Sequence, residues 1–240
     1  MSTIDPAFGL RDHSFNFNTS RTLTDSFTVT NGVLEYGTDG AEFTINKQNE
    51  SPTIKSKFYI FFGSVSVVMR AAAGQGIISS IVLQSEDLDE VDWEFMGGFP
   101  KIAQSNYFGK GNTTSFDRAV YHNTTEDVRE LFHNYTVDWT KEKMDFYIDS
   151  VKVRTLMYGD ANGGKNYPQT PCTLRLGIWA GGDEANNNKG TVEWAGGKTD
   201  FSKAPFSMIV KSAQVSDYST GKEYEWTDRS GSFQSIKSVQ

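Results

Sequence analysis

The chain has 240 residues, of which 13% are aromatic and 22 are glycines, and its formal net charge at pH 7 is −7. This length fits one large β domain or two small ones, and the negative charge argues against nucleic acid or an anionic membrane as the main partner. No apolar run approaches the roughly 18 residues that a membrane-spanning helix needs. A neutral polymer such as a polysaccharide is compatible with this composition.

The first part of the chain alternates like a series of β-strands, after an irregular polar segment at residues 1–24 that we expect to pack on the outside. Residues 27–29 and 33–36 flank Thr30-Asn31-Gly32, and an Asn-Gly step between such runs is a hairpin signal. Further strand-like runs follow at residues 42–45, 53–62, 63–70 and 77–84.

The second part of the chain continues in the same way. Its strand-like runs are residues 102–108, 131–140, 144–148, 151–156, 172–179 and 206–218. Turn residues recur between these runs, and convincing helical periodicity is missing. The pattern therefore indicates an all-β sandwich rather than alternating strands and helices.

Between the two parts lies an acidic stretch at residues 88–96, with the sequence LDEVDWEFM. Glu90, Asp92 and Glu94 alternate with apolar residues, so a strand places the three carboxyls on one face and Trp93 on the core face. Like charges this close repel, so we expect at least one carboxyl to have a raised pKa. The spacing fits an exposed acidic strand, a calcium-binding edge, or a carboxylate pair for glycoside chemistry.

The glycoside interpretation depends on the distance between the two glutamates. Cα atoms four residues apart on a strand are ~13 Å apart, whereas retaining glycosidases need carboxyl groups about 5–5.5 Å apart. Two glutamate side chains that lean toward each other over the shorter Asp92, on a curved strand, can close most of this gap.

Four blocks of sequence resemble a known family in the same order along the chain. They are residues 89–95 (DEVDWEF), 104–111 (QSNYFGKG), 174–183 (LRLGIWAGGD) and 190–197 (GTVEWAGG). Over roughly residues 58–215 the chain resembles glycoside hydrolase family 16, and within it the fungal Crh-type chitin–glucan transglycosylases. The resemblance implies a concanavalin-like β-jelly roll of two curved antiparallel sheets with a concave sugar-binding cleft. We expect this catalytic domain at residues 25–220 and a tail packed on it at residues 221–240.

The resemblance also implies roles for the acidic residues. Glu90 corresponds to the nucleophile that attacks the anomeric carbon, and Glu94 to the general acid/base that protonates the leaving oxygen. Asp92 is an auxiliary residue that keeps the two pKa values apart. A covalent glycosyl-enzyme then forms on Glu90, and the configuration of the sugar is retained.

We expect substrate-binding residues on both sides of this stretch. Gln104 and Asn106 can bind sugar hydroxyls if both face the cleft, or can form a polar cross-strand pair. Trp179 and Trp194 lie in Gly-rich loops, where an exposed indole can stack on a sugar ring. The remaining candidates are Tyr107, Lys110, Trp139, Arg175 and Thr191. For Lys110 an ordinary solvated charge, and for Trp139 a core position, stay open.

No residue pattern indicates a metal or a cofactor. His13, His122 and His133 lack metal-ligand spacing, and no phosphate-binding Gly loop is present. Cys172 is the only cysteine, so no intrachain disulfide can form, and we expect it to be a buried apolar thiol.

The function implied by the resemblance is a retaining glycosidase and transglycosylase that crosslinks the fungal cell wall. It would cleave chitin, a β-1,4-linked polymer of N-acetylglucosamine, and transfer it to a β-glucan or chito-oligosaccharide acceptor, with weak endo-chitinase activity as a side reaction. The alternatives are an endo-β-1,3(4)-glucanase of the same family and a non-catalytic lectin on the same fold.

The location of the protein follows from similar arguments. Five N-x-S/T sequons, at Asn18, Asn49, Asn112, Asn123 and Asn134, together with the resemblance favour a secreted, cell-wall glycoprotein. We also expect a monomer. Residues 1–6 do not resemble a signal peptide, and no hydrophobic C-terminal run signals a lipid anchor.

Overall fold

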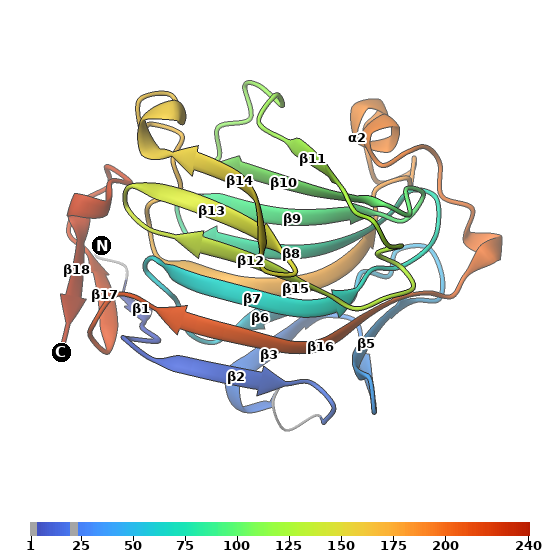
Figure 1. Cartoon of the computed structure of the whole chain (residues 1–240), viewed down its shortest axis with the longest axis horizontal. Coiled ribbons are helices and arrows are strands. Elements are labelled where there is room, and N and C mark those ends of the chain that lie inside the picture. Colours follow the sequence, from blue (N-terminus) through green and yellow to red (C-terminus); the bar gives the residue numbers. More distant parts are fainter. Residues whose placement is uncertain (1–3, 20–23) are drawn as a thin grey trace.

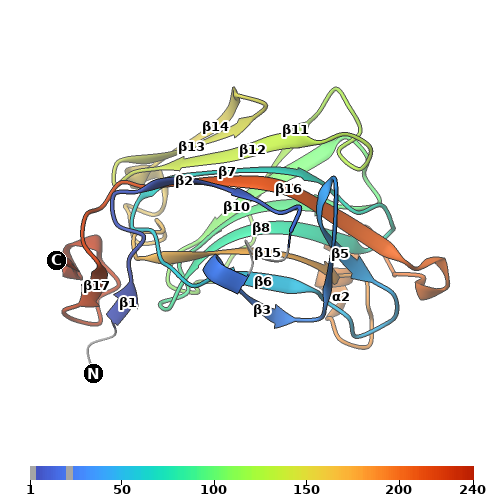
Figure 2. The same ribbon diagram turned by 90° about the horizontal axis from the view of Figure 1, so that it is seen from below.

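The computed structural model describes residues 4–19 and 24–240; residues 1–3 and 20–23 of the segment predicted as irregular lie outside the described residues. Two large antiparallel sheets pack face to face, as Figure 1 and Figure 2 show from two directions. The prediction of an all-β sandwich is confirmed.

One sheet has seven strands in the order β11-β10-β9-β8-β15-β6-β3. In chain order these strands are β3 (Phe27–Asn31), β6 (Thr53–Ser56), β8 (Ile77–Ser85), β9 (Glu90–Met96), β10 (Ile102–Phe108), β11 (Val120–Asn123) and β15 (Cys172–Ala180). The acidic stretch forms β9, which lies between β8 and β10.

The other large sheet follows the order β14-β13-β12-β7-β16-β5-β4, and β2 pairs with β16 outside this path. Its strands are β2 (Asp12–Asn16), β4 (Leu34–Gly37), β5 (Gly40–Ile45), β7 (Gly63–Arg70), β12 (His133–Trp139), β13 (Lys143–Ile148), β14 (Val151–Met157) and β16 (Phe206–Asp217).

A third, small sheet joins the two ends of the chain. It contains β1 (Ile4–Pro6), β17 (Glu223–Trp226) and β18 (Ile236–Val239), with β17 in the middle. Figure 1 shows this sheet at the opposite end of the molecule from helix α2 (Lys189–Trp194). Three 3-10 turns are also present: η1 (Tyr158–Asp160), η2 (Phe201–Lys203) and η3 (Phe233–Ser235).

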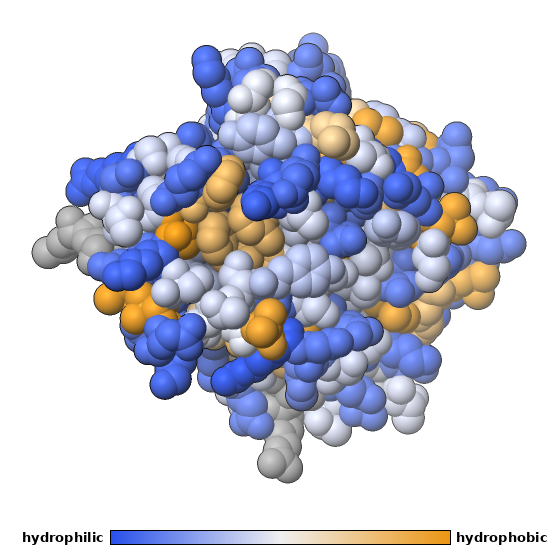
Figure 3. Space-filling view, turned by 60° about the vertical axis from the view of Figure 1, so that its left-hand side comes forward, coloured by the Kyte–Doolittle hydropathy of each residue, from blue (hydrophilic) through white to orange (hydrophobic). Residues whose placement is uncertain are grey.

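The hydrophobic core fills the space between the two large sheets. Val65, Val67 and Met69 alternate with partly exposed residues along β7, so one face of that strand is buried. From the opposite sheet Trp93 contacts Tyr135 on β12, with ring centroids 5.6 Å apart. The predicted core position of Trp93 is confirmed. Toward the small sheet, Figure 3 shows a largely hydrophilic surface with a few small hydrophobic areas.

Some local predictions are wrong. β3 and β4 do not form a hairpin, because β3 pairs with β6 in one large sheet while β4 pairs with β5 in the other. The turn at Asn31-Gly32, with Gly32 at φ +70°, therefore carries the chain between the sheets. The strand predicted at residues 53–62 ends at Ser56.

Short elements are also missing from the sequence prediction. Residues 1–24 are not irregular throughout, because they contain β1 and β2, in which only Asp5 and Phe15 are buried. The tail at residues 221–240 contains β17 and β18. Helix α2 has six residues, which is too short for a helical period to stand out.

Candidate active site

The acidic residues of β9 lie on the face of the seven-stranded sheet that points away from the core. Glu90, Asp92 and Glu94 line a groove together, whereas Val91 and Trp93 between them are buried in the core. The predicted strand with its three carboxyls on one face is confirmed.

The groove has a volume of about 270 Å³ and crosses β9, β8, β15 and β6. The residues that line it are Thr53, Ser80, Val82, Gln84, Glu90, Asp92, Glu94, Arg175, Gly177 and Trp179. On β8, Gln84 is opposite Glu90 and Ser80 is opposite Glu94. On the other flank of β9, Gln104 of β10 is opposite Glu94. The carboxyls are therefore flanked by polar side chains on both neighbouring strands.

Asp92 is the most buried of the three acids. Burial first, and then the charges of Glu90 and Glu94 and a hydrogen bond to Glu90, raise the pKa of Asp92 well above its ordinary value. Its Oδ1 atom is buried with no hydrogen-bond partner among the described residues. These conditions favour the protonated, neutral form of Asp92 beside Glu90.

Glu94 also holds its proton more strongly than an exposed glutamate. Burial, followed by the charge of Glu90, raises the pKa of Glu94 to about 8. A carboxyl with this pKa is mostly protonated at pH 7 and can act as a proton donor. The expectation that at least one carboxyl has a raised pKa is confirmed.

Glu90 begins β9, whereas Arg175 is on β15, level with Asp92 across β8. Gln84 donates a hydrogen bond through Nε2 to Oε2 of Glu90 and so orients this carboxyl. Arg175 lines the same groove from β15, and its Nε is buried with no hydrogen-bond partner among the described residues. Arg175 therefore lines the groove with an unused donor beneath its surface, and its binding role stays a prediction.

Gln104 differs from its prediction. Its side chain has no exposed surface, so the prediction that it contacts sugar directly is wrong. In the amide orientation that satisfies all its neighbours, Gln104 donates to Glu94 Oε2 at 3.2 Å and accepts from Trp194 Nε1 and from the Tyr121 hydroxyl, both at 3.0 Å. Gln104 therefore contacts an acid of the site rather than the groove itself.

Trp179 and Trp194 lie together at the end of the groove nearest Glu94. Their rings stack with centroids 6.0 Å apart and an interplanar angle of 21°, and both side chains keep partial exposure. They do not lie in loops as predicted, since Trp179 is on β15 and Trp194 ends helix α2. An indole pair that is packed on one side and open on the other suits the apolar face of a sugar ring.

The binding roles predicted for two further residues are wrong, because the side chains of these residues are in the core. Trp139 has no exposed surface, and its Nε1 donates to the carbonyl of Pro168 at 2.9 Å. Tyr107 is opposite Val91 on the buried face of the sheet, and its ring packs against the guanidinium of Arg154. Alternation along β12 and β10 decides both positions.

The other predicted binding residues occupy different surroundings. Asn106 is opposite Asp92, and its Oδ1 accepts from the Tyr107 backbone at 2.9 Å. Lys110 does not line the groove; its Nζ donates to the Ser230 carbonyl at 2.8 Å. Thr191 is in helix α2, where its backbone donates to the N-cap Asn188 at 3.0 Å. Binding roles for Asn106, Lys110 and Thr191 stay predictions.

A buried acid that we did not assign fixes the start of β9. Asp89 has no exposed surface and accepts hydrogen bonds from the backbones of Lys110 and Gln169, at 2.9 and 2.8 Å, and from the Thr170 hydroxyl at 2.6 Å. Burial raises the pKa of Asp89 to about 6. Because these bonds join three segments directly before Glu90, they set where β9 begins.

Gln84 and Tyr121 were also not predicted. Both belong to strands that become neighbours of the site only through the pairing of the sheet. The alternation of Ser80, Val82 and Gln84 just before the acidic strand is the one sequence signal for such a role.

The described residues contain no group of three or more histidine, cysteine, aspartate or glutamate side chains placed to hold a metal ion. Among the described helices, none has the length and apolar character required to cross a membrane. Cys172 is buried and free, as predicted.

Comparison with known proteins places this groove among carbohydrate-active enzymes. Residues 23–196 match the model of glycosyl hydrolases family 16. The chain is 64% identical over 235 residues to Crh-like protein 2 of Botryotinia fuckeliana, covering 98% of this chain and 52% of that protein. It is 50% identical over 235 residues to Crh-like protein 1 of Aspergillus fumigatus, covering 98% and 65%.

Solved structures agree with this result. A Crh5 transglycosylase in complex with NAG superposes with a TM-score of 0.94 at 49% identity, covering 98% of this chain and 95% of that one. A prokaryotic β-1,3-1,4-glucanase shares the fold, with a TM-score of 0.70 at 17% identity, covering 85% of this chain and 98% of that one. The chain spans about half to two thirds of the length of the curated relatives described above.

Proposed function

The chain belongs to glycosyl hydrolases family 16, and from this membership we propose that it is a retaining transglycosylase that crosslinks the fungal cell wall. The donor is chitin, and the acceptor is a β-glucan or a chito-oligosaccharide. The observation that carries the proposal is the alignment of Glu90, Asp92 and Glu94 in one groove, with the pKa of Glu94 raised to about 8.

In the first step Glu90 attacks the anomeric carbon while Glu94 gives its proton to the leaving glycosidic oxygen. The raised pKa of Glu94 supports the acid role, because this carboxyl still carries its proton at neutral pH. The bond from Gln84 holds Glu90 in position for attack. Protonated Asp92 beside Glu90 adds no second negative charge and can donate a hydrogen bond to it.

In the second step Glu94, now ionised, takes the proton from the incoming hydroxyl as that hydroxyl attacks the sugar on Glu90. Transfer requires an acceptor sugar to compete with water, which depends on how well the sugar is held near the reacting carbon. The stacked pair Trp179 and Trp194 supplies a surface for one of the two sugar chains.

The choice of donor rests on a relative. The Crh5 transglycosylase structure contains NAG, and its 49% identity over nearly the whole chain supports the same sugar here. Because its substrate lies in the cell wall, we also propose that the protein is secreted. We further propose that it acts as a monomer and that exposed sequons such as Asn123 carry glycans.

Incubation with a chitin oligomer and a fluorescent laminari-oligosaccharide, followed by chromatography, tests the proposal. We expect lengthened fluorescent products from the wild type, none from Glu90→Gln, and wild-type amounts from Glu223→Gln, an exposed glutamate of the small sheet. Shortened chitin without fluorescent product would indicate a hydrolase. Intact chitin with cleaved glucan would favour an endo-β-1,3(4)-glucanase, and binding without any cleavage a lectin.

A further inference from the structure

The buried side chain of Gln104 lies beneath the groove between Glu94 and two aromatic residues. It comes from β10, whereas Tyr121 comes from β11 and Trp194 from helix α2. Three separate elements therefore meet at one amide, although the amide itself has no exposed surface.

The chemistry of these neighbours fixes which way the amide points. An indole N–H can only donate, so the atom of Gln104 that faces Trp194 Nε1 must be the carbonyl oxygen. The Tyr121 hydroxyl donates to the same oxygen, which has two lone pairs. With the oxygen held in this way, the NH₂ group must face Glu94 Oε2 at 3.2 Å.

We propose that Gln104 is a positioning residue for the acid/base Glu94, and that Trp194 and Tyr121 hold its amide in the orientation that donates to Glu94. This inference rests on the proposed function, because it assigns Gln104 a task in the acid and base steps of that reaction. It replaces the direct sugar contact that the sequence predicts for Gln104.

The donated hydrogen bond acts on Glu94 in two ways. It holds one carboxyl oxygen toward β10, so the other oxygen keeps a fixed direction. It also favours the ionised form, which the second step needs, against the burial that favours the protonated form. Trp194 additionally stacks on Trp179, so the same indole joins the aromatic surface of the groove to the acid/base residue.

The other groups around Glu94 do not supply such a bond. On the same strand, the charge of Glu90 raises the pKa of Glu94, and the hydrogen bond of Asp92 goes to Glu90 instead. β8 contributes the Ser80 hydroxyl, which donates to the Gly177 carbonyl at 3.2 Å. The cation of the groove is Arg175, which comes from β15, beyond β8.

The direct test is a titration of Glu94 by NMR, which needs no substrate. Protein labelled with ¹³C at the glutamate side-chain carboxyls is titrated, and the Glu94 signal is assigned by its absence from Glu94→Gln. In Gln104→Met we expect the midpoint of the Glu94 titration to rise by about one pH unit. The reason is that the ionised Glu94 carboxylate loses the hydrogen bond from the Gln104 amide. The control Gln214→Met, at an exposed position of β16, should leave it unchanged.

A double variant tests the role of the two aromatic residues. Tyr121→Phe with Trp194→Phe leaves an aromatic ring at both positions but removes both donors, so the amide can turn its oxygen toward Glu94. We expect an upward shift of the Glu94 midpoint here too. An unchanged midpoint in both Gln104→Met and the double variant, with the fold intact by circular dichroism, would overturn the proposal. If Gln104→Met does not fold, the double variant decides.

Kinetics separate positioning from substrate binding. With the chitin oligomer, the basic limb of the pH profile of kcat/KM should move upward in Gln104→Met, and kcat should fall more than KM rises. A rise in KM alone would instead mean that Gln104 binds sugar. If the wild type fails to cleave chitin but the NMR midpoint shifts, the donor assignment fails and the positioning role stands.

Discussion

Replacing Glu94 by glutamine should stabilise the folded protein while it abolishes activity. Folding raises the pKa of Glu94 from its ordinary 4.5 to about 8, so above about pH 4.5 the folded protein keeps a proton that the unfolded chain releases. The contribution of Glu94 to stability therefore becomes less favourable as the pH rises from about 4.5 to about 8. Glutamine does not titrate, so this pH-dependent loss of stability disappears, and its amide oxygen can still accept the bond from Gln104.

The size of the gain follows from the same values. One pKa unit corresponds to about 1.4 kcal/mol, so keeping Glu94 protonated at pH 7 costs about 3 kcal/mol of folding free energy. Because the Glu94 side chain is only partly buried, solvent reduces this penalty, and we expect a gain of about 2 kcal/mol at pH 7. For a domain of this size that gain raises Tm by about 4–8 °C.

Urea unfolding at about pH 4.5, 7 and 8.5 measures this effect on the free energy of unfolding. The gain of Glu94→Gln over wild type should be close to zero at the lowest pH and largest at the highest. Glu223→Gln, a matched change at an exposed glutamate, should stay within about 0.5 kcal/mol of wild type throughout. A gain that does not depend on pH, or a loss that grows with pH, would refute the reasoning.

Three further substitutions test other parts of the structure. Trp179→Ala should raise KM for chitin oligomers roughly fivefold with little change in kcat, because a stacking surface is lost; steady-state kinetics check this, and an unchanged KM would contradict the stacking role. Trp139→Phe should lower the free energy of unfolding by about 2–4 kcal/mol, through a cavity and an unpaired Pro168 carbonyl, without affecting KM. Asp89→Ala should lower the free energy of unfolding in urea by about 3 kcal/mol, since buried donors lose their acceptor at the start of β9. It should also lower kcat, and an unchanged kcat would show that Glu90 is positioned without Asp89.

The acidic strand could be predicted from the sequence because its pattern is local. Glu90, Asp92 and Glu94 alternate with core residues, and this alternation alone places them on one face. The crossing at Asn31-Gly32 could not be predicted in this way, because the same two residues fit a hairpin and a passage between sheets. Only the pairing of β3 with β6, distant in the chain, decides between them.

The surroundings of the acids were harder to predict for the same reason. Whether Gln104 faces sugar or Glu94 depends on Trp194 and Tyr121, which approach it from other elements. Tyr107 and Trp139 are aromatic residues near the motif, but the register of their strands turns both toward the core. Asp89 directly precedes Glu90 in the sequence, yet its partners at Gln169 and Thr170 become visible only in the fold.

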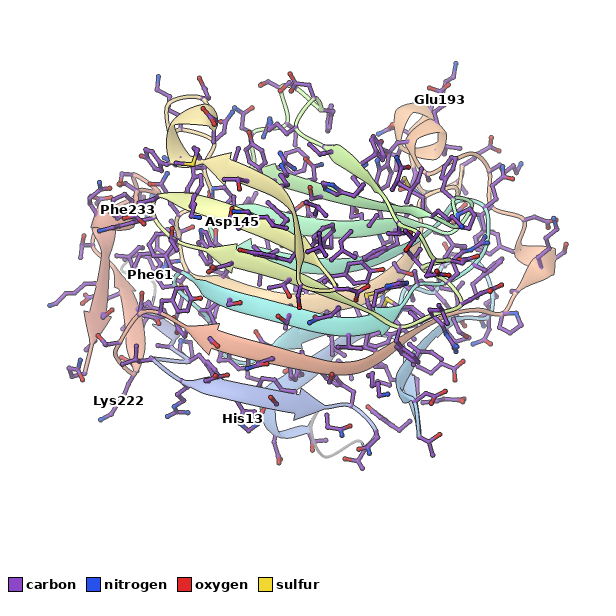
Figure 4. All side chains as sticks on the ribbon, in the orientation of Figure 1. His13, Phe61, Asp145, Glu193, Lys222 and Phe233 are labelled. Carbon is purple, nitrogen blue, oxygen red and sulfur yellow. The ribbon has the colours of Figure 1, made fainter. Side chains whose placement is uncertain are left out.

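The position of the small sheet affects how the protein can be attached to a support. β1 and β18 both pair with β17, and neighbouring strands are about 4.8 Å apart, so strands β1 and β18 lie roughly 10 Å apart in this sheet. The label at Lys222 marks this end of the molecule in Figure 4, and Glu193 marks helix α2 at the other end. A bead or electrode joined beside this sheet would therefore leave helix α2 and the Trp179–Trp194 pair at the far end, directed into solution.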